Sequence, residues 1–156
     1  MPTPSELADA YLAGVNSLRD AVKGLTPEQL RARPIAGKWS TLEVVAHIAD
    51  FEPILADRIT RLIALDNPTL LAADENEFAK HLFYEDRQLD EELAVITAIR
   101  TKMARLIRKL TPEQLQRTGT HSVRGPLPLE KIIQMAINHI PHHVPFILEK
   151  RAALGV

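Results

Sequence analysis

Residues 25–30 read LTPEQL, and the same six residues occur again at 110–115. In each copy a Thr precedes a Pro, and a Gln follows three residues after the Thr. This order is typical of a helix start, because Pro fits the first helical position and the Gln side chain can return a hydrogen bond to the Thr that caps the helix. Further along each half, Leu42-Glu43 matches Leu129-Glu130 at almost the same offset. The sequence therefore predicts the unit helix–TPEQL–loop–helix twice.

Apolar residues at helical spacing predict four long helices. The expected ranges are 5–25, 40–65, 88–110 and 128–154. The second has the clearest start, a capping box with Ser40 at the N-cap and Glu43 three residues later. A long crossover over 66–86, with one short helix near 75–82, joins the second helix to the third, and residues 117–128 are expected to form a loop. Two helical hairpins of one plan make an all-α four-helix bundle with an internal pseudo-two-fold repeat.

Composition fits one globular domain spanning residues 1–156. Apolar residues make up 46% of the chain and charged residues 25%, and the net charge of −1 argues against a nucleic-acid partner. The segment RTKMARLIRK at 100–109 carries five positive charges, which we interpret as a solvated helix face. There is no Cys, so disulfides, thiolate ligands and a Cys nucleophile are excluded. With neither a signal-peptide pattern nor an apolar run long enough for a membrane span, a cytoplasmic location is expected.

Six histidines are the best candidates for chemistry. His47 lies within the apolar stripe of the second predicted helix, and His139 and His143 lie four residues apart on one face of the last. An i, i+4 pair can bind one metal ion, and three neutral imidazoles would leave a coordination position open, as in catalytic sites. Alternatively, each of the three is a hydrogen-bonded core residue. His142 falls on a more polar face, and His81 and His121 are expected to be solvated.

Other features near these histidines allow two interpretations each. Prolines inside the helices could kink the bundle and open a pocket, or simply bend a helix; they are Pro53, Pro141 and Pro145. Trp39 is expected to pack at the end of the bundle, with a place in a pocket wall as the second interpretation. Asp50 and Glu52 could orient an imidazole or act as a base, but such acids are more often solvated, and no catalytic or cofactor-binding residue is assigned.

Three stretches of the sequence are typical of one protein family. They are GKWSTLEVVAHIADFE at 37–52, LFYEDR at 82–87 and NHIPHHVPFILEKRAAL at 138–154. With them the chain resembles the DinB-like superfamily, also called the DinB/YfiT-like metalloenzymes. The resemblance covers nearly the whole chain. It implies a four-helix bundle with a long link between its second and third helices, and a divalent metal held by His47, His139 and His143. Many members have a further His, or His-Arg-Gly-Gln, where this chain has Val144-Pro145-Phe146.

The resemblance also implies a range of functions. Some members transfer low-molecular-weight thiols, some isomerise small acids with the help of a thiol, and some are proposed hydrolases. We therefore expect a metal-dependent thiol S-transferase or hydrolase that acts on a small molecule, with Zn, Ni, Fe or Mn as the metal and any thiol as a cosubstrate. The alternatives are a non-catalytic metal- or small-ligand-binding bundle, related to stress, and a purely structural bundle. Members are often homodimers, to which the apolar residues Ile63, Leu70 and Leu71 are expected to contribute.

Overall fold

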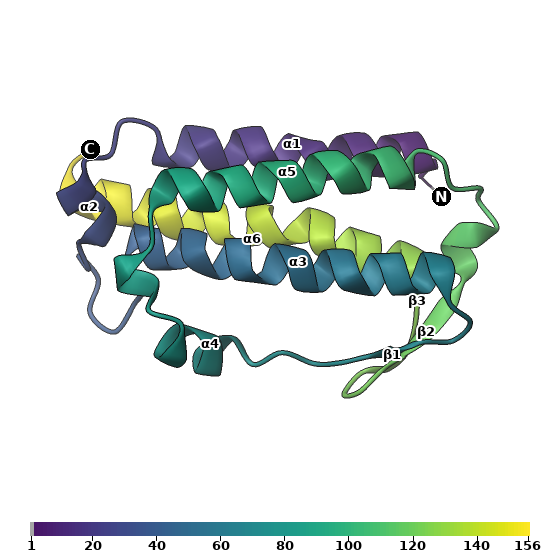
Figure 1. Cartoon of the computed structure of the whole chain (residues 1–156). Coiled ribbons are helices and arrows are strands. Elements are labelled where there is room, and N and C mark those ends of the chain that lie inside the picture. The colour runs from purple at the N-terminus through teal and green to yellow at the C-terminus, as the bar shows by residue number, and fades with distance from the viewer. Residues whose placement is uncertain (1) are drawn as a thin grey trace.

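The computed structural model describes residues 2–156, in which four long helices form a bundle (Figure 1). They are α1 (Pro4–Val22), α3 (Thr41–Ala64), α5 (Leu89–Ile107) and α6 (Leu129–Leu154). Each begins and ends within three residues of its predicted bounds, so the all-α four-helix bundle is confirmed. The shorter helical elements are α2 (Pro27–Arg31), α4 (Glu75–His81) and the 3₁₀ turns η1 (Tyr84–Asp86) and η2 (Gln114–Gln116).

The two LTPEQL segments make the same local hydrogen bonds. In the first, the Thr26 amide donates to Gln29 Oε1 at 2.8 Å and the Gln29 amide to Thr26 Oγ1 at 3.2 Å. In the second, the same two bonds join Thr111 and Gln114 at 2.8 and 3.3 Å. The first copy starts the short helix α2, whereas the second leads into η2. The repeat read from the sequence is therefore present as a repeated capping structure.

The packing of the helices explains the long crossover. Helix α1 packs against α5 and α6, and α3 packs against the same two helices, so the two helices of each repeat lie diagonally across the bundle. Figure 1 shows that α3 and α5 run in the same direction. The chain must therefore return along the whole bundle between them, and it does so through residues 65–88, which pass over the outside of α3 and include α4.

Residues 117–128, predicted to be a loop, instead form a β-hairpin, so that prediction was wrong. Strands β2 (Thr118–His121) and β3 (Gly125–Pro128) are antiparallel, and β1 (Thr69–Leu70) of the crossover pairs with β2 in parallel, with Leu70 opposite His121. Gly119 permits this pairing, since a Cβ there would lie 2.8 Å from the Pro68 carbonyl oxygen. The strand is thus stabilised by a distant partner, which local sequence patterns do not reveal.

A buried polar network joins all four long helices. The Arg100 guanidinium of α5 donates to Glu52 Oε1 of α3 at 2.8 Å, and to the carbonyl oxygens of Tyr11 in α1 and Ala136 in α6 at 2.8 Å each. The Tyr11 hydroxyl donates to Glu52 Oε2 at 2.8 Å. All three side chains are fully buried, so the expectation that Arg100 and Glu52 are solvated was wrong. Burial raises the pKa of Glu52, and the charge of Arg100 opposes that change.

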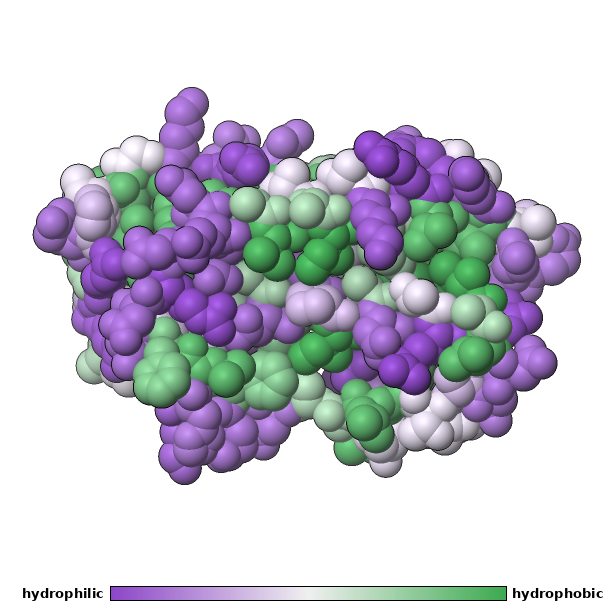
Figure 2. All heavy atoms as spheres, in the orientation of Figure 1, coloured by the Kyte–Doolittle hydropathy of each residue, from purple (hydrophilic) through white to green (hydrophobic). Residues whose placement is uncertain are grey.

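Charged and polar side chains cover much of the surface seen in Figure 2, with smaller hydrophobic clusters between them. Of the apolar residues expected at an outer position, Leu71 is exposed and Ile63 is partly buried. Leu70, the second residue of β1, is instead buried in the core, which corrects its proposed place in an interface. Within residues 2–156, no helix combines the length and the apolar character that crossing a membrane requires.

Candidate metal centre

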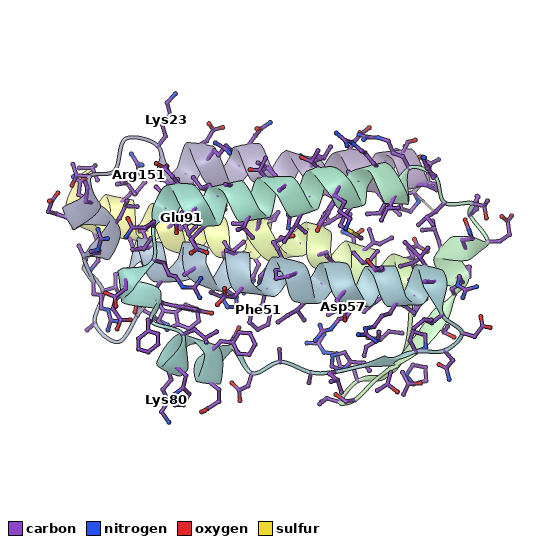
Figure 3. The ribbon with its side chains drawn as sticks, in the orientation of Figure 1. Lys23, Phe51, Asp57, Lys80, Glu91 and Arg151 are labelled. Atoms are coloured by element: carbon purple, nitrogen blue, oxygen red, sulfur yellow. The ribbon has the colours of Figure 1, made fainter. Side chains whose placement is uncertain are left out.

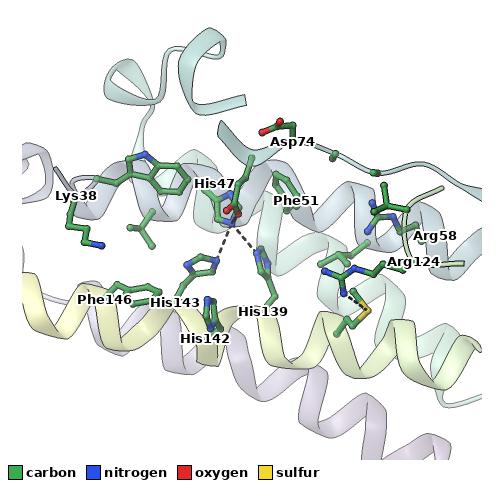
Figure 4. A pocket seen from close by; sticks show the side chains of 18 of the residues that line it. Lys38, His47, Phe51, Arg58, Asp74, Arg124, His139, His142, His143 and Phe146 are labelled. Atoms are coloured by element: carbon green, nitrogen blue, oxygen red, sulfur yellow. Dashed lines mark hydrogen bonds and ion pairs between the residues drawn. The ribbon is translucent and has the colours of Figure 1, made fainter. Parts of the chain in front are cut away.

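Three imidazole rings meet between the neighbouring helices α3 and α6 (Figure 4). His47 Nε2 lies 3.1 Å from His139 Nε2 and 3.0 Å from His143 Nε2. The candidate ligand nitrogens of the three rings all lie within 4.8 Å of one another. His47 comes from the first half of the repeat and the other two from the second. The structure therefore brings together the three residues selected from the sequence, across the two halves of the chain.

Hydrogen bonding alone does not satisfy this cluster. A ring nitrogen carries either one proton or one in-plane lone pair, so only one of its two short contacts here can be a well-directed hydrogen bond. His47 Nε2 is within bonding distance of both of its neighbours, and one of those contacts is left unsatisfied. A cation between the three lone pairs would satisfy all of them. Two imidazole nitrogens on one tetrahedral zinc lie about 3.3 Å apart, close to the spacing observed here.

The three rings are neutral near pH 7, as metal ligands must be. Burial lowers the pKa of His47 to about 4, even though Asp50 opposes the shift. Burial, followed by the charges of the neighbouring histidines, lowers the pKa of His139 to about 2. The pKa of His143 falls to about 3 for the same reasons. Each ring therefore keeps a lone pair available to a cation over the physiological pH range.

Aromatic packing holds the His47 ring. Its centroid lies 5.3 Å from that of Trp39 and 4.6 Å from that of Phe51. Phe51 in turn lies between α3 and α4 (Figure 3), with its ring 5.4 Å from that of Phe78. In the described part of the chain, the buried Nδ1 atoms of His47 and His139 have no hydrogen-bond partner. Packing, not a carboxylate, therefore fixes the ring, and Trp39 forms part of the site as well as of the core.

The three histidines lie in the wall of a cavity of about 1080 Å³. Helices α3 and α6 form one side, and the crossover and the β-hairpin form the other. Glu75, the first residue of α4, places Oε2 3.8 Å from His47 Nε2, and its side chain is 56% exposed. The sequence analysis missed Glu75, because the predicted short helix gave no sign that its first turn lies over His47.

The remaining candidates lie apart from the cluster. His142 is exposed and lines the cavity beside His143, and His81 is exposed, 3.3 Å from Glu77. His121 was expected to be solvated, but it is buried in β2. Asp50 pairs with Arg87 at 2.8 Å and makes no hydrogen bond to a histidine in the described residues. Helix α6 continues without a break through its two prolines.

Comparisons with known proteins agree with this arrangement. A family model described as the DinB superfamily matches residues 11–147. A protein of Oceanobacillus iheyensis named "Putative metal-dependent hydrolase" is 29% identical over 130 residues. The match covers 83% of this chain and 75% of the length of that protein. A protein of the same description from Bacillus cereus is 26% identical over 158 residues. That match covers 99% of this chain and 91% of the length of the relative.

Among solved structures, YfiT from Bacillus subtilis, described as "a probable metal-dependent hydrolase with an unusual four-helix bundle topology", superposes with a TM-score of 0.89. It is 22% identical, and the match covers 97% of this chain and 87% of YfiT. That likeness establishes the fold, including the diagonal placement of the repeated helices. Together with the family match over most of the sequence, it leads to one conclusion: this chain belongs to the DinB superfamily.

Proposed function

We propose that the protein is a metal-dependent hydrolase that acts on a small molecule in the cavity, with His47, His139 and His143 as the ligands of a divalent metal. The observation that carries the proposal is the convergence of three neutral imidazoles at the wall of a large cavity. The names of the relatives support the same reaction class. Imidazole nitrogen is a ligand for Zn, Ni, Fe and other divalent transition metals, so the donor set favours this class over Mg and Ca.

A divalent metal in such a site supplies Lewis-acid chemistry, which lowers the pKa of water and polarises a carbonyl or phosphoryl oxygen. The chain supplies the other parts. The Glu75 carboxylate, on the cavity side of His47, can take a proton from a reactant and return it to a leaving group. Trp39 and Phe51 keep the His47 ring in place and exclude water from its sides.

Thiol S-transfer is the second candidate. The cavity is slightly larger than the range of about 300–1,000 Å³ that is typical of ligand pockets, so it can admit a thiol beside a substrate. Because the chain has no Cys, that thiol would have to enter as a cosubstrate. A bundle that binds metal or a small ligand without turnover is the third outcome that an experiment must separate.

The test begins with elemental analysis of protein purified without an affinity tag. We expect about one equivalent of divalent metal in the wild type and in His142→Ala, and none in His139→Ala. His142 is the matched control, because it lines the same cavity from the same helix but stands outside the cluster. Equal metal content in both variants would refute the ligand assignment.

The metal-loaded protein is then assayed on ester, amide and phosphoester panels, with and without low-molecular-weight thiols. Hydrolysis without thiol supports the first candidate, and turnover that requires a thiol supports the second. Saturable binding without turnover in any assay would show a non-catalytic binding protein.

A further inference from the structure

One end of the cavity carries positive charge without a counterion. Figure 4 shows Arg58 and Arg124 at this end, opposite Lys38. Arg58 belongs to α3, and Arg124 to the turn between β2 and β3. No carboxylate lies within ion-pair distance of either guanidinium in the part of the chain that is described.

Arg58 is buried and incompletely bonded. The residue is only 7% exposed, and its Nη2 donates to the Leu71 carbonyl oxygen at 2.6 Å. Its Nε is buried and has no acceptor among residues 2–156. Burial, and then the charge of Arg124, lowers the pKa of Arg58. A buried guanidinium with an unbonded N–H group and a like charge nearby destabilises the fold, unless an anion accepts that hydrogen bond and balances the charge.

The neighbouring acids are engaged elsewhere. Asp57 precedes Arg58 but pairs with Arg61 at 2.7 Å. Asp74, also in the cavity wall, caps α4 by accepting from the amides of Asn76 and Glu77. The positive end of the cavity is therefore not neutralised by the acids closest to it.

His121 adds a third donor to this end. Its Nδ1 accepts the backbone N–H groups of Val123 and Arg124 at 3.2 and 3.3 Å. The neutral ring must therefore carry its proton on Nε2, for which residues 2–156 offer no hydrogen-bond acceptor. The backbone around these groups is fixed by the sheet, in which Leu70 pairs with His121 and the Ser122 amide donates to the Leu70 carbonyl at 2.9 Å.

We propose that Arg58, Arg124 and His121 bind a carboxylate or phosphate group of the substrate. This inference rests on the proposed function, since it places the reacting end of the same molecule at the three histidines. His47, Phe51, Leu55 and Arg58 follow one another along the cavity face of α3. Eleven residues separate His47 from Arg58, a rise of about 16 Å, and the Arg side chain shortens it by leaning toward the helix N-terminus. The substrate is then an elongated small acid whose anionic and reacting ends are separated by less than this rise of about 16 Å.

The test uses NMR titration of the full-length protein with two probes, inorganic phosphate and butyrate. The backbone amide resonances of Val123 and Arg124 are followed in every variant, and the Arg58 Nε–H resonance is followed in the chains that keep Arg58. We expect wild type and His139→Ala to bind with equal affinity, because the subsite does not depend on the metal. Arg58→Gln and Arg124→Gln should bind at least tenfold more weakly. Arg105→Gln, which removes an exposed arginine of α5 outside the cavity wall, should match the wild type. The tighter probe assigns the substrate as a phosphate or a carboxylate.

Several results would overturn the proposal. One is a failure of the wild type to bind either probe. Another is undiminished binding to Arg124→Gln. The Arg124 side chain is exposed and makes a single hydrogen bond within residues 2–156, to the Met135 sulfur, so it can be changed without unfolding the chain. Binding lost in His139→Ala alone would place the anion at the metal centre. A wild type without metal that still binds phosphate would instead refute the proposed hydrolase and leave the subsite intact.

Discussion

Replacing Arg100 by Met should destabilise the protein severely. Arg100 supplies the donors for the Glu52 carboxylate and for the carbonyls of Tyr11 and Ala136, all of them buried. The Met side chain fills much of the volume, but it leaves the Glu52 carboxylate with the Tyr11 hydroxyl as its remaining donor and without a neutralising charge, and it removes the Arg100 bond from each carbonyl. Removing one partner of a buried ion pair costs about 3–5 kcal/mol. For a chain of 156 residues, each kcal/mol corresponds to about 2–4 °C, so the melting temperature should fall by roughly 6–20 °C.

The assay is urea and thermal unfolding followed by circular dichroism. Arg105→Met is the matched control, because Arg105 lies on the same helix and is exposed, and its loss should change the free energy of unfolding by less than about 0.5 kcal/mol. Adding Glu52→Gln to Arg100→Met removes the uncompensated charge and should recover at least about 1 kcal/mol. An Arg100→Met variant within about 1 kcal/mol of the wild type, or a double variant less stable than the single, would refute the reasoning.

Three further predictions concern the backbone, the metal and pH. Gly14→Ala should lower the free energy of unfolding by about 1–3 kcal/mol in urea titrations, because the added Cβ would lie 2.5 Å from Arg100 Nη1. This loss should exceed the gain from the better helix propensity of Ala. Unchanged stability would contradict the contact. Chelator-treated protein should keep its helical circular dichroism signal but melt about 5–11 °C lower if metal is normally at a hundredfold excess over its Kd, and loss of most helical signal would show a structural metal. In the metal-free protein, histidines of the unfolded chain take up protons below about pH 6.5, whereas the folded ones stay neutral to about pH 4 or lower, so stability should fall as pH drops through this interval. His47→Gln should reduce that dependence in pH-resolved melts, and an unchanged slope would show that these rings do not cause it.

Local patterns predicted the helices and the histidine cluster well, because the forces that determine them are local. The capping box at Ser40 is present as two bonds, from the Ser40 amide to Glu43 Oε2 at 2.6 Å and from the Glu43 amide to Ser40 Oγ at 3.2 Å. Four-residue spacing placed His139 and His143 on one face whatever the tertiary structure. The apolar stripe around His47 and the one shared by His139 and His143 on the last helix then directed all three inward.

The misses share a physical cause, which is pairing between residues far apart in the sequence. Arg100 and Glu52 are charged residues on amphipathic helices, and nothing within either helix shows that the other will neutralise it 48 residues away. His121 is buried because β2 pairs with β1, a partner 51 residues earlier. Glu75 reaches His47 only because the crossover folds back over α3.

The crossover has a consequence for how such a protein can change. Parallel α3 and α5 require a connection of about the length of the bundle, whatever molecule the protein handles. That connection supplies the cavity wall from Ala72 to Glu75, yet α4 contains no fully buried residue. Substitutions in this stretch can therefore change the shape of this cavity wall with little loss of folding stability, while the bundle keeps the three imidazoles in place. Exchanging residues 71–82 between relatives, with Glu75 kept, is accordingly a practical route to new substrate preferences on an unchanged scaffold.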